Sequence, residues 1–320
     1  MTLKKRILLL EPKGFPHEAY KQLLSIAEIE SCPEKEPPSE GLLKQSQVIF
    51  CRLGRKLDDE FFSKCPKLEY IVSPTTGLDH IDLGIAQEKG VKVLSLKGQT
   101  NFLRTITATA ELTWGLLISV NRHLPSSIAS VKAGVWDRNR FIGVQLTGKT
   151  IGIIGYGRIG RQVAVYANAF GLKVVWYDPY VSIEDGVNKK ARLETLLEKS
   201  DFVSVHAPLN PETRKILGAR EFKLMKDNVC IINTSRGGLI DEAQLLAGLK
   251  TGKVRGAGLD VLQFEFNGKL KDDRLWEYSQ ENENLIITPH IGGATAESMG
   301  ATEQHMVQIL LEEILGGQHV

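Results

Sequence analysis

The chain has 320 residues, of which 42% are hydrophobic and 24% charged, and at roughly 100–200 residues per domain this length predicts two globular domains. The formal net charge is only +2 and no block of like charges occurs, so a nucleic-acid partner is not expected. The longest uncharged apolar stretch, Leu112 to Val120, is about half of what a membrane span needs, which argues against a membrane partner and predicts a soluble protein.

The first third of the chain alternates short apolar runs with helical patterns, as is typical of an open α/β sheet. The expected strands are Ile7 to Leu10, Val48 to Cys51, Tyr70 to Val72 and Val91 to Leu94, and the expected helices span 17–27 and 82–89. Apolar residues then recur at helical spacing over 103–123, and Pro125 ends this pattern. We expect a long linking helix there.

A second alternation of strands and helices begins after the turn at 146–149. The expected strands span 149–154, 173–177, 201–205, 229–233 and 254–259, and the expected helices span 158–170, 192–199 and 241–250. Strands that alternate with helices form mostly parallel, doubly wound sheets. Further on, Asn267 to Asn284 is polar and reads as a surface excursion, and 295–316 is again helical.

The four cysteines, Cys32, Cys51, Cys65 and Cys230, include no CxxC pair and no spacing typical of metal ligands. We therefore expect reduced thiols, no bound metal and a cytoplasmic location.

A glycine-rich loop follows the strand at 149–154 and opens the helix at 158–170. It reads Gly155, Tyr156, Gly157, Arg158, Ile159, Gly160. Glycines at this spacing allow a tight turn, a close approach of the backbone to a pyrophosphate and close packing of helix on strand. The next strand ends in Asp178, whose carboxylate can accept both adenosine ribose hydroxyls and repels a 2′-phosphate. The pattern predicts a dinucleotide site that prefers NAD to NADP.

Three polar residues stand after later strands, at the sheet edge where ligands bind in open α/β folds. They are Arg236, Glu265 and His290. A guanidinium can hold a planar carboxylate through two parallel hydrogen bonds, and an imidazole can exchange a proton with the neighbouring oxygen. A carboxylate beside the imidazole favours its protonated form. The set suits hydride transfer at C2 of a 2-hydroxy or 2-oxo acid, although each residue alone also has a purely structural explanation.

The order of motifs resembles the D-isomer specific 2-hydroxyacid dehydrogenase family, and within it the phosphoglycerate dehydrogenase branch. The matching segments are Thr76 to Asp82, Thr109 to Leu112, Gly134 to Trp136, the glycine loop, Val205 to Leu209, Thr234 to Asp241, Gly258 to Val261 and Thr288 to His290. The resemblance implies two Rossmann-like doubly wound domains: an NAD-binding domain at 103–291, and a smaller substrate domain of 1–102 completed by 292–320. It also implies homodimers that form through the nucleotide domain.

The resemblance further assigns roles to individual residues. Arg236 would hold the substrate carboxylate, His290 would be the acid and base, and Glu265 would support the histidine. The residues expected at the cofactor, beyond the loop and Asp178, are His206, Pro208, Thr213, Thr234, Asp260 and Gly293. Thr76 and Gly77 would bind the substrate carboxylate through their backbone, and Arg52 would contact a phosphate or second carboxylate unless it is a surface or salt-bridged arginine.

These residues favour an NAD-dependent dehydrogenase for a small, phosphoglycerate-like hydroxy acid. Three alternatives stay open: a glyoxylate or hydroxypyruvate reductase, an NAD(H)-sensing regulator on the same fold, and a formate or phosphite dehydrogenase. The Arg236, Glu265 and His290 set favours 2-oxo acids over formate, whose oxidation needs no proton-donating pair.

Overall fold

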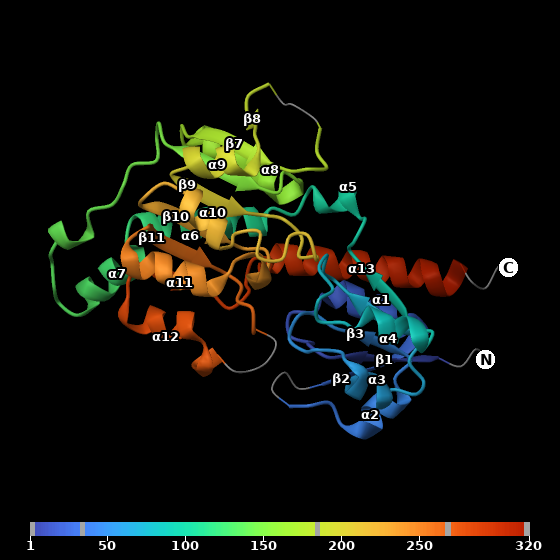
Figure 1. The fold of residues 1–320 in the computed structure, drawn as a ribbon. Helices are drawn as coiled ribbons and strands as arrows, with labels where there is room; N and C mark the ends of the chain where they lie inside the picture. The colour runs from blue at the N-terminus through green and yellow to red at the C-terminus, as the bar shows by residue number, and fades with distance from the viewer. Residues whose placement is uncertain (1–3, 33–35, 183–185, 266–269, 317–320) are drawn as a thin grey trace. The chain divides into compact units, whose positions relative to one another are not determined.

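Two parallel β-sheets organise the chain in the computed structural model, which describes residues 4–32, 36–182, 186–265 and 270–316 (Figure 1). The chain divides into unit 1, formed by Met1–Thr105 with Ala294–Val320, and unit 2, Ile106–Gly293. The sequence predicted divisions after residues 102 and 291.

Unit 1 contains a five-stranded sheet in the order β2-β1-β3-β4-β5, with every neighbouring pair parallel. Its strands are β1 (Lys5–Leu9), β2 (Ala27–Ser31), β3 (Val48–Phe50), β4 (Tyr70–Ser73) and β5 (Lys92–Ser95). Its helices are α1 (His17–Ile26), α2 (Glu40–Gln45), α3 (Asp59–Ser63), α4 (Leu83–Glu88), α5 (Thr100–Leu103) and α13 (Ala296–Gly316). Helix α13 packs on α1, β4 and β5, so the C-terminal helix belongs to the first unit.

Strand β2 was missed by the sequence patterns, which extended the preceding helix to residue 27. The backbone of Ala27 is already extended, and Ala27–Ser31 pairs with β1 at the edge of the sheet. Two glutamates and a serine in five residues are typical of an edge strand, where charge blocks further pairing but weakens the apolar signal of a strand.

Unit 2 contains a seven-stranded sheet in the order β12-β11-β10-β9-β6-β7-β8, again with parallel neighbours. Its strands are β6 (Thr150–Ile154), β7 (Lys173–Tyr177), β8 (Lys189–Lys190), β9 (Phe202–Val205), β10 (Val229–Asn233), β11 (Val254–Leu259) and β12 (Leu285–Ile287). Its helices are α6 (Ala108–Asn121), α7 (Leu124–Lys132), α8 (Arg158–Ala169), α9 (Leu193–Lys199), α10 (Ala219–Leu224), α11 (Glu242–Thr251) and α12 (Arg274–Glu281), with 3-10 turns at Asn139–Phe141, Gly237–Leu239 and Leu270–Asp272.

Side chains alternate between two apolar layers along each central strand of unit 2. Ile151 and Ile153 face the layer that α6 and α8 cover, whereas Ile154 faces the layer that α9, α10 and α11 cover. Because both faces are buried, the strands read as nearly continuous apolar runs, which is why the sequence located them well. The doubly wound α/β fold is as predicted, and the strand order reverses between β6 and β9.

The expected linking helix at 103–123 is shorter than predicted and belongs to unit 2. Helix α6 begins at Ala108, because the carbonyl of Ile106 accepts side-chain hydrogen bonds from Arg158 and Gln162 at 2.6 and 3.2 Å. After α6 ends, Pro125 lies in the first turn of α7 rather than at the end of helical structure. Proline is tolerated there because the first-turn N–H groups need no partner within the helix.

The polar segment expected as a surface excursion also contains a helix. Helix α12 buries Leu275 and packs on α11 and β12, and the carboxylate of Asp273 caps its first turn. The helix is only eight residues long and carries its apolar side chains at Leu275, Trp276 and Tyr278, so its amphipathic pattern spans too few turns to stand out within a polar segment. The start of the excursion, Asn267 to Lys269, lies outside the described residues.

Candidate active site

The glycine loop of unit 2 connects β6 to α8. Gly155 has φ +89°, and a Cβ there would lie 2.6 Å from the main-chain carbonyl carbon of His206. A Cβ at Gly160 would lie 2.1 Å from the carbonyl oxygen of Gly155. Gly157, at the N-cap of α8, makes no side-chain cap and leaves open space around its Cα. The first N–H groups of α8 thus have no side-chain cap and can receive an anion.

The non-glycine residues of this loop offer their backbone, because their side chains point elsewhere. The Tyr156 ring stacks on Trp176, with 4.2 Å between ring centroids and planes 8° apart. The guanidinium of Arg158 donates to Ile106, and Ile159 packs against the layer that α6 and α8 cover. Tyr156, Arg158 and Ile159 are therefore expected to contact a cofactor only through the main chain.

Asp178 follows β7 and lies directly beside the loop. Its Oδ2 accepts the N–H of Tyr156 at 2.9 Å, and its Oδ1 accepts the N–H of Tyr180 at 2.9 Å. A carboxylate has about four lone-pair sites, so each oxygen can accept a ribose hydroxyl as well. The glycine loop, the uncapped N-terminus of α8 and the carboxylate of Asp178 together fit NAD.

His206, Pro208 and Thr213 belong to the segment that follows β9. Burial lowers the pKa of His206 to about 3, so its imidazole is neutral, and its Nε2 shares a hydrogen with Ser204 Oγ at 2.7 Å. The buried Nδ1 of His206 has no hydrogen-bond partner among the described residues, which suits a ligand group. The hydroxyl of Thr213 donates to the carbonyl of Pro208 at 2.6 Å and thereby shapes the turn.

The structure brings two of the predicted catalytic residues together. His290 Nδ1 lies 3.2 Å from Glu265 Oε1, although 25 residues separate them in the chain. Glu265 follows β11 and His290 follows β12, and these strands are neighbours in the sheet. With Nδ1 facing the carboxylate, Nε2 is the nitrogen that remains for a substrate proton.

Asp260 holds the loop that carries His290. Its Oδ1 accepts the hydroxyl of Thr288 at 2.6 Å and the N–H of Ile291 at 2.8 Å, and its Oδ2 accepts the N–H of Gly292 at 2.7 Å. Burial raises the pKa of Asp260, an effect that these hydrogen bonds and His290 oppose. The resemblance places Asp260 at the cofactor, and in the structure these three bonds also hold the loop at 288–292 in position. In the sequence, the only sign that Asp260 holds the loop of His290 is its place in the Gly258 to Val261 motif.

Arg236 lies in the turn after β10, the strand adjacent to β11. Its Nη1 donates to the carbonyl of Ser235 at 2.7 Å. Asn233, which sequence reasoning overlooked, shapes this turn by donating to the carbonyl of Arg236 at 2.9 Å and accepting the N–H of Ser235 at 3.0 Å. The sequence feature that could have revealed this role of Asn233 is a polar residue at the end of an apolar strand.

Two further predicted cofactor residues differ in their surroundings. The Thr234 hydroxyl lies 2.7 Å from the hydroxyl of Thr113 on α6, so it joins the strand end to that helix. Gly293 is exposed, with open space around its Cα.

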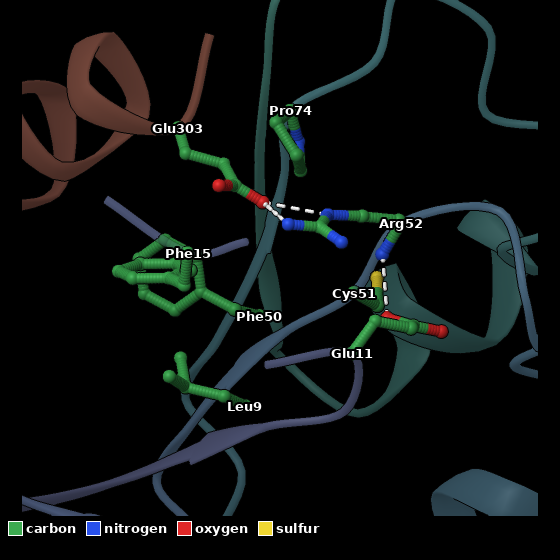
Figure 2. A pocket seen from close by; sticks show the side chains of 8 residues that line it. All are labelled: Leu9, Glu11, Phe15, Phe50, Cys51, Arg52, Pro74 and Glu303. Carbon is green, nitrogen blue, oxygen red and sulfur yellow. Dashed lines mark hydrogen bonds and ion pairs between the residues drawn. The ribbon is translucent and has the colours of Figure 1, made fainter. Parts of the chain in front are cut away.

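In unit 1, the predicted substrate loop at Thr76 and Gly77 follows β4. A chain of hydrogen bonds braces it: buried His80 lies 3.3 Å from Ser73 Oγ, this hydroxyl lies 2.9 Å from Thr75 Oγ1, and Thr75 donates to the Gly77 carbonyl at 2.8 Å. Thr76 itself is exposed. Arg52 follows β3 and forms an ion pair with Glu303 of α13 (Figure 2). Arg52 is thus a salt-bridged arginine, which was the alternative to a substrate contact that the sequence left open.

The described residues contain no group of three or more His, Cys, Asp or Glu side chains that could hold a metal ion. Within the same residues, every helix is too short or too polar to cross a membrane.

Comparison with known proteins identifies the relatives of this chain. Residues 114–292 match the model of the NAD binding domain of D-isomer specific 2-hydroxyacid dehydrogenases. The chain is 38% identical over 319 residues to a D-3-phosphoglycerate dehydrogenase of Methanocaldococcus jannaschii, and this match covers 98% of the chain but 58% of that protein. It is 36% identical over 299 residues to a hydroxypyruvate reductase of Thermotoga maritima, with 93% of the chain and 95% of that protein covered.

Among solved structures, the chain resembles a D-lactate dehydrogenase from Aquifex aeolicus complexed with NAD and lactic acid. The TM-score is 0.81 and the identity 30%, and the match covers 98% of this chain and 96% of that one. The relatives are named for different substrates, so they support the reaction class without fixing the substrate. Together with the glycine loop and the His290–Glu265 pair, these matches show that the chain belongs to the D-isomer specific 2-hydroxyacid dehydrogenase family.

Proposed function

We propose that this protein is an NAD-dependent reductase of a small 2-oxo acid, which in the reverse direction oxidises the corresponding D-2-hydroxy acid. The observation that carries the proposal is the His290–Glu265 pair, with Nδ1 and Oε1 3.2 Å apart, on the same sheet edge as Arg236 and the glycine loop. NAD, when bound, supplies or accepts the hydride at C2.

The side chains of unit 2 perform the remaining steps. Arg236 grips the substrate carboxylate with two parallel N–H donors and draws electron density from the adjacent carbonyl. His290 donates the proton from Nε2 to the carbonyl oxygen as the hydroxyl forms, and Glu265 stabilises the imidazolium and orients the ring. In the oxidative direction the same nitrogen removes the proton. Thr76 and Gly77 are the proposed backbone contacts of the carboxylate in unit 1.

The phosphoglycerate-like substrate favoured by the sequence drew on the branch that the chain resembles and on an Arg52 that could meet a phosphate or second carboxylate. Because Arg52 pairs with Glu303, we favour the second expectation, a hydroxypyruvate-like or glyoxylate-like 2-oxo acid. The relatives named hydroxypyruvate reductase and glyoxylate reductase support this choice.

The test is oxidation of NADH at 340 nm by the purified protein with glyoxylate, hydroxypyruvate, pyruvate, oxaloacetate, 2-oxoglutarate and 3-phosphohydroxypyruvate. Turnover of at least one acid that disappears in His290→Ala supports the proposal. NADH binding by both proteins with no turnover of any acid contradicts it and supports an NAD(H)-sensing regulator instead.

We also propose that the protein forms a homodimer through α7 and the segment that follows it, drawn in green in Figure 1. Six large apolar side chains are exposed between residues 124 and 142: Leu124, Ile128, Val131, Val135, Trp136 and Ile142. Trp136 is 88% exposed. An apolar surface of this kind is typical of an interface, and a second copy is the partner that the family resemblance implies.

Light scattering during size-exclusion chromatography tests the dimer. Trp136→Ser combined with Ile142→Ser should convert it to a monomer, whereas Val165→Ser, which changes an exposed valine on α8, should not. A monomeric wild-type protein would contradict the proposal.

The four free, buried cysteines fit the cytoplasmic location that we propose.

A further inference from the structure

Arg52 of unit 1 is held by an acidic partner from the other end of the chain (Figure 2). Its Nε donates to Glu303 Oε1 at 2.6 Å, and its Nη2 contacts the same oxygen. Its Nη1 donates to the carbonyl of Lys13 at 2.9 Å. The Glu303 side chain is only 3% exposed, so the pair lies largely out of water.

The pair borders a small pocket at the carboxyl ends of β1 and β3. Apolar side chains of Leu9, Phe15 and Phe50 line the pocket together with Pro74. In the order β2-β1-β3-β4-β5, the chain leaves β1 toward one edge of the sheet and β3 toward the other, and ligands of open α/β sheets bind at such a switch point. Pro74 also leads into the loop of Thr76 and Gly77.

The charges around this pocket oppose an anionic ligand. Among the described residues that line it, Arg52 is the one cationic side chain, and the carboxylates of Glu303 and Glu11 both lie beside it. Glu11 Oε2 accepts the backbone N–H of Arg52 at 2.9 Å. A phosphate or carboxylate that took the guanidinium would leave a buried carboxylate unpaired, which is strongly unfavourable.

The same surroundings suit a hydroxyl group. Glu303 Oε2 is buried and has no hydrogen-bond partner among the described residues, so it is an unused acceptor beside the pocket. A neutral hydroxyl can donate to such an oxygen without disturbing the ion pair.

We propose that Glu303 determines substrate specificity: by neutralising Arg52, it makes this pocket select 2-oxo acids whose far end is an uncharged hydroxyl over those that end in a phosphate or second carboxylate. This inference rests on the proposed reductase function and adds to it the chemical class of the substrate.

The test compares hydroxypyruvate, oxaloacetate and 3-phosphohydroxypyruvate in steady-state reduction. Burial raises the pKa of Glu303 to about 7, against the effect of Arg52, so the assays are run at pH 8, where the carboxyl is ionised. The wild-type kcat/KM should favour hydroxypyruvate by tenfold or more. Glu303→Gln keeps the shape but frees the charge of Arg52, and the preference should shift toward the two charged acids by at least about tenfold.

Three further variants separate charge from structure. Glu303→Asp keeps the charge and should keep the wild-type preference. Adding Arg52→Met to Glu303→Gln should remove the gain for the charged acids, because the cation is gone. Glu313→Gln breaks another ion pair between α13 and the sheet, with Lys92 at 2.7 Å, and should leave the preference unchanged.

A wild-type protein that uses either charged acid as well as hydroxypyruvate, or a Glu303→Gln variant with an unchanged preference, overturns the inference. A second measurement does not depend on turnover: D-glycerate should raise the unfolding temperature of the NADH-bound protein more than D-malate or 3-phosphoglycerate does, and Glu303→Gln should reverse this order. If no 2-oxo acid is reduced, the proposed function fails, and these thermal shifts still decide the inference about Glu303.

Discussion

Asp260 holds His290 from two directions: the N–H of His290 donates to the main-chain carbonyl of Asp260 at 2.9 Å, and the Asp260 carboxylate accepts the N–H groups of the next two residues. His290 itself has φ 51°, a left-handed conformation that a side chain other than glycine adopts rarely. A strained backbone of this kind persists only where its surroundings hold it, and here Asp260 does so.

Asp260→Asn should therefore lower kcat by about tenfold or more, since a tenfold change needs only about 1.4 kcal/mol in the barrier. The amide must turn its NH2 group toward one of the N–H or O–H donors, so at least one hydrogen bond is lost and the loop at 288–292 shifts. Steady-state kinetics and the unfolding temperature are measured together. Thr288→Val removes only one of the bonds and should have a smaller effect. A normal kcat with a lowered unfolding temperature would assign Asp260 to stability alone.

The pair of His290 and Glu265 should behave as one unit in catalysis. His290→Ala should lower kcat by about 10²–10⁴-fold, the usual contribution of a general acid or base, while the Kd for NADH stays close to that of the wild type. Glu265→Gln should lower kcat less, because the ring is still oriented but its positive charge is no longer stabilised.

The double variant of these two residues tests whether they act together. Adding Glu265→Gln to His290→Ala should cause little further loss, since the glutamate acts through the histidine. Fully multiplicative losses would show that Glu265 has an independent role.

Asp178→Ala should relax the preference for NADH over NADPH. The carboxylate repels a 2′-phosphate, so its removal should raise the NADPH-to-NADH ratio of kcat/KM by about tenfold or more. The Tyr156 N–H loses its acceptor in this variant, and its unfolding temperature is recorded to separate stability from selectivity. An unchanged ratio would mean that another group holds the ribose.

Glu242 should make the stability of the fold depend on pH. Burial raises the pKa of Glu242 to about 7, so between about pH 4.5 and 7 the folded protein binds a proton that the unfolded chain releases. Stability from this group is therefore fully present at low pH and lost as the pH rises through 7. Glu242→Gln keeps an acceptor for the Gln263 N–H and should be more stable than the wild type at pH 8 but not at pH 5.

Thermal unfolding at the two pH values measures this difference. Glu281→Gln, at an exposed position on α12, is the matched control and should show no pH-dependent gain. Equal effects of Glu242→Gln on stability at pH 5 and pH 8 would show that folding does not raise the pKa of Glu242.

The sequence alone determined the nucleotide-binding half of this protein to a large degree. The strands of unit 2 are buried on both faces, so their apolar runs are unambiguous, and the glycine loop must follow a strand and open a helix to function. Arg236, Glu265 and His290 could be predicted to stand at one edge of the sheet because the carboxyl ends of parallel strands share that edge. These features depend on local patterns and on general rules of parallel sheets.

Only the tertiary structure decided which charged groups meet. Arg52 and Glu303 are 251 residues apart, and Asp260 and Thr288 are 28 apart, so no periodicity links either pair. The edge strand β2 and helix α12 were also decided by packing, because five and eight residues are too few to establish a pattern, and each element is stabilised by the neighbouring strand or helix on which it packs. Whether Arg52 is free or neutralised depends on where the last helix packs, and this is a property of the assembled core of unit 1 rather than of any segment of the chain.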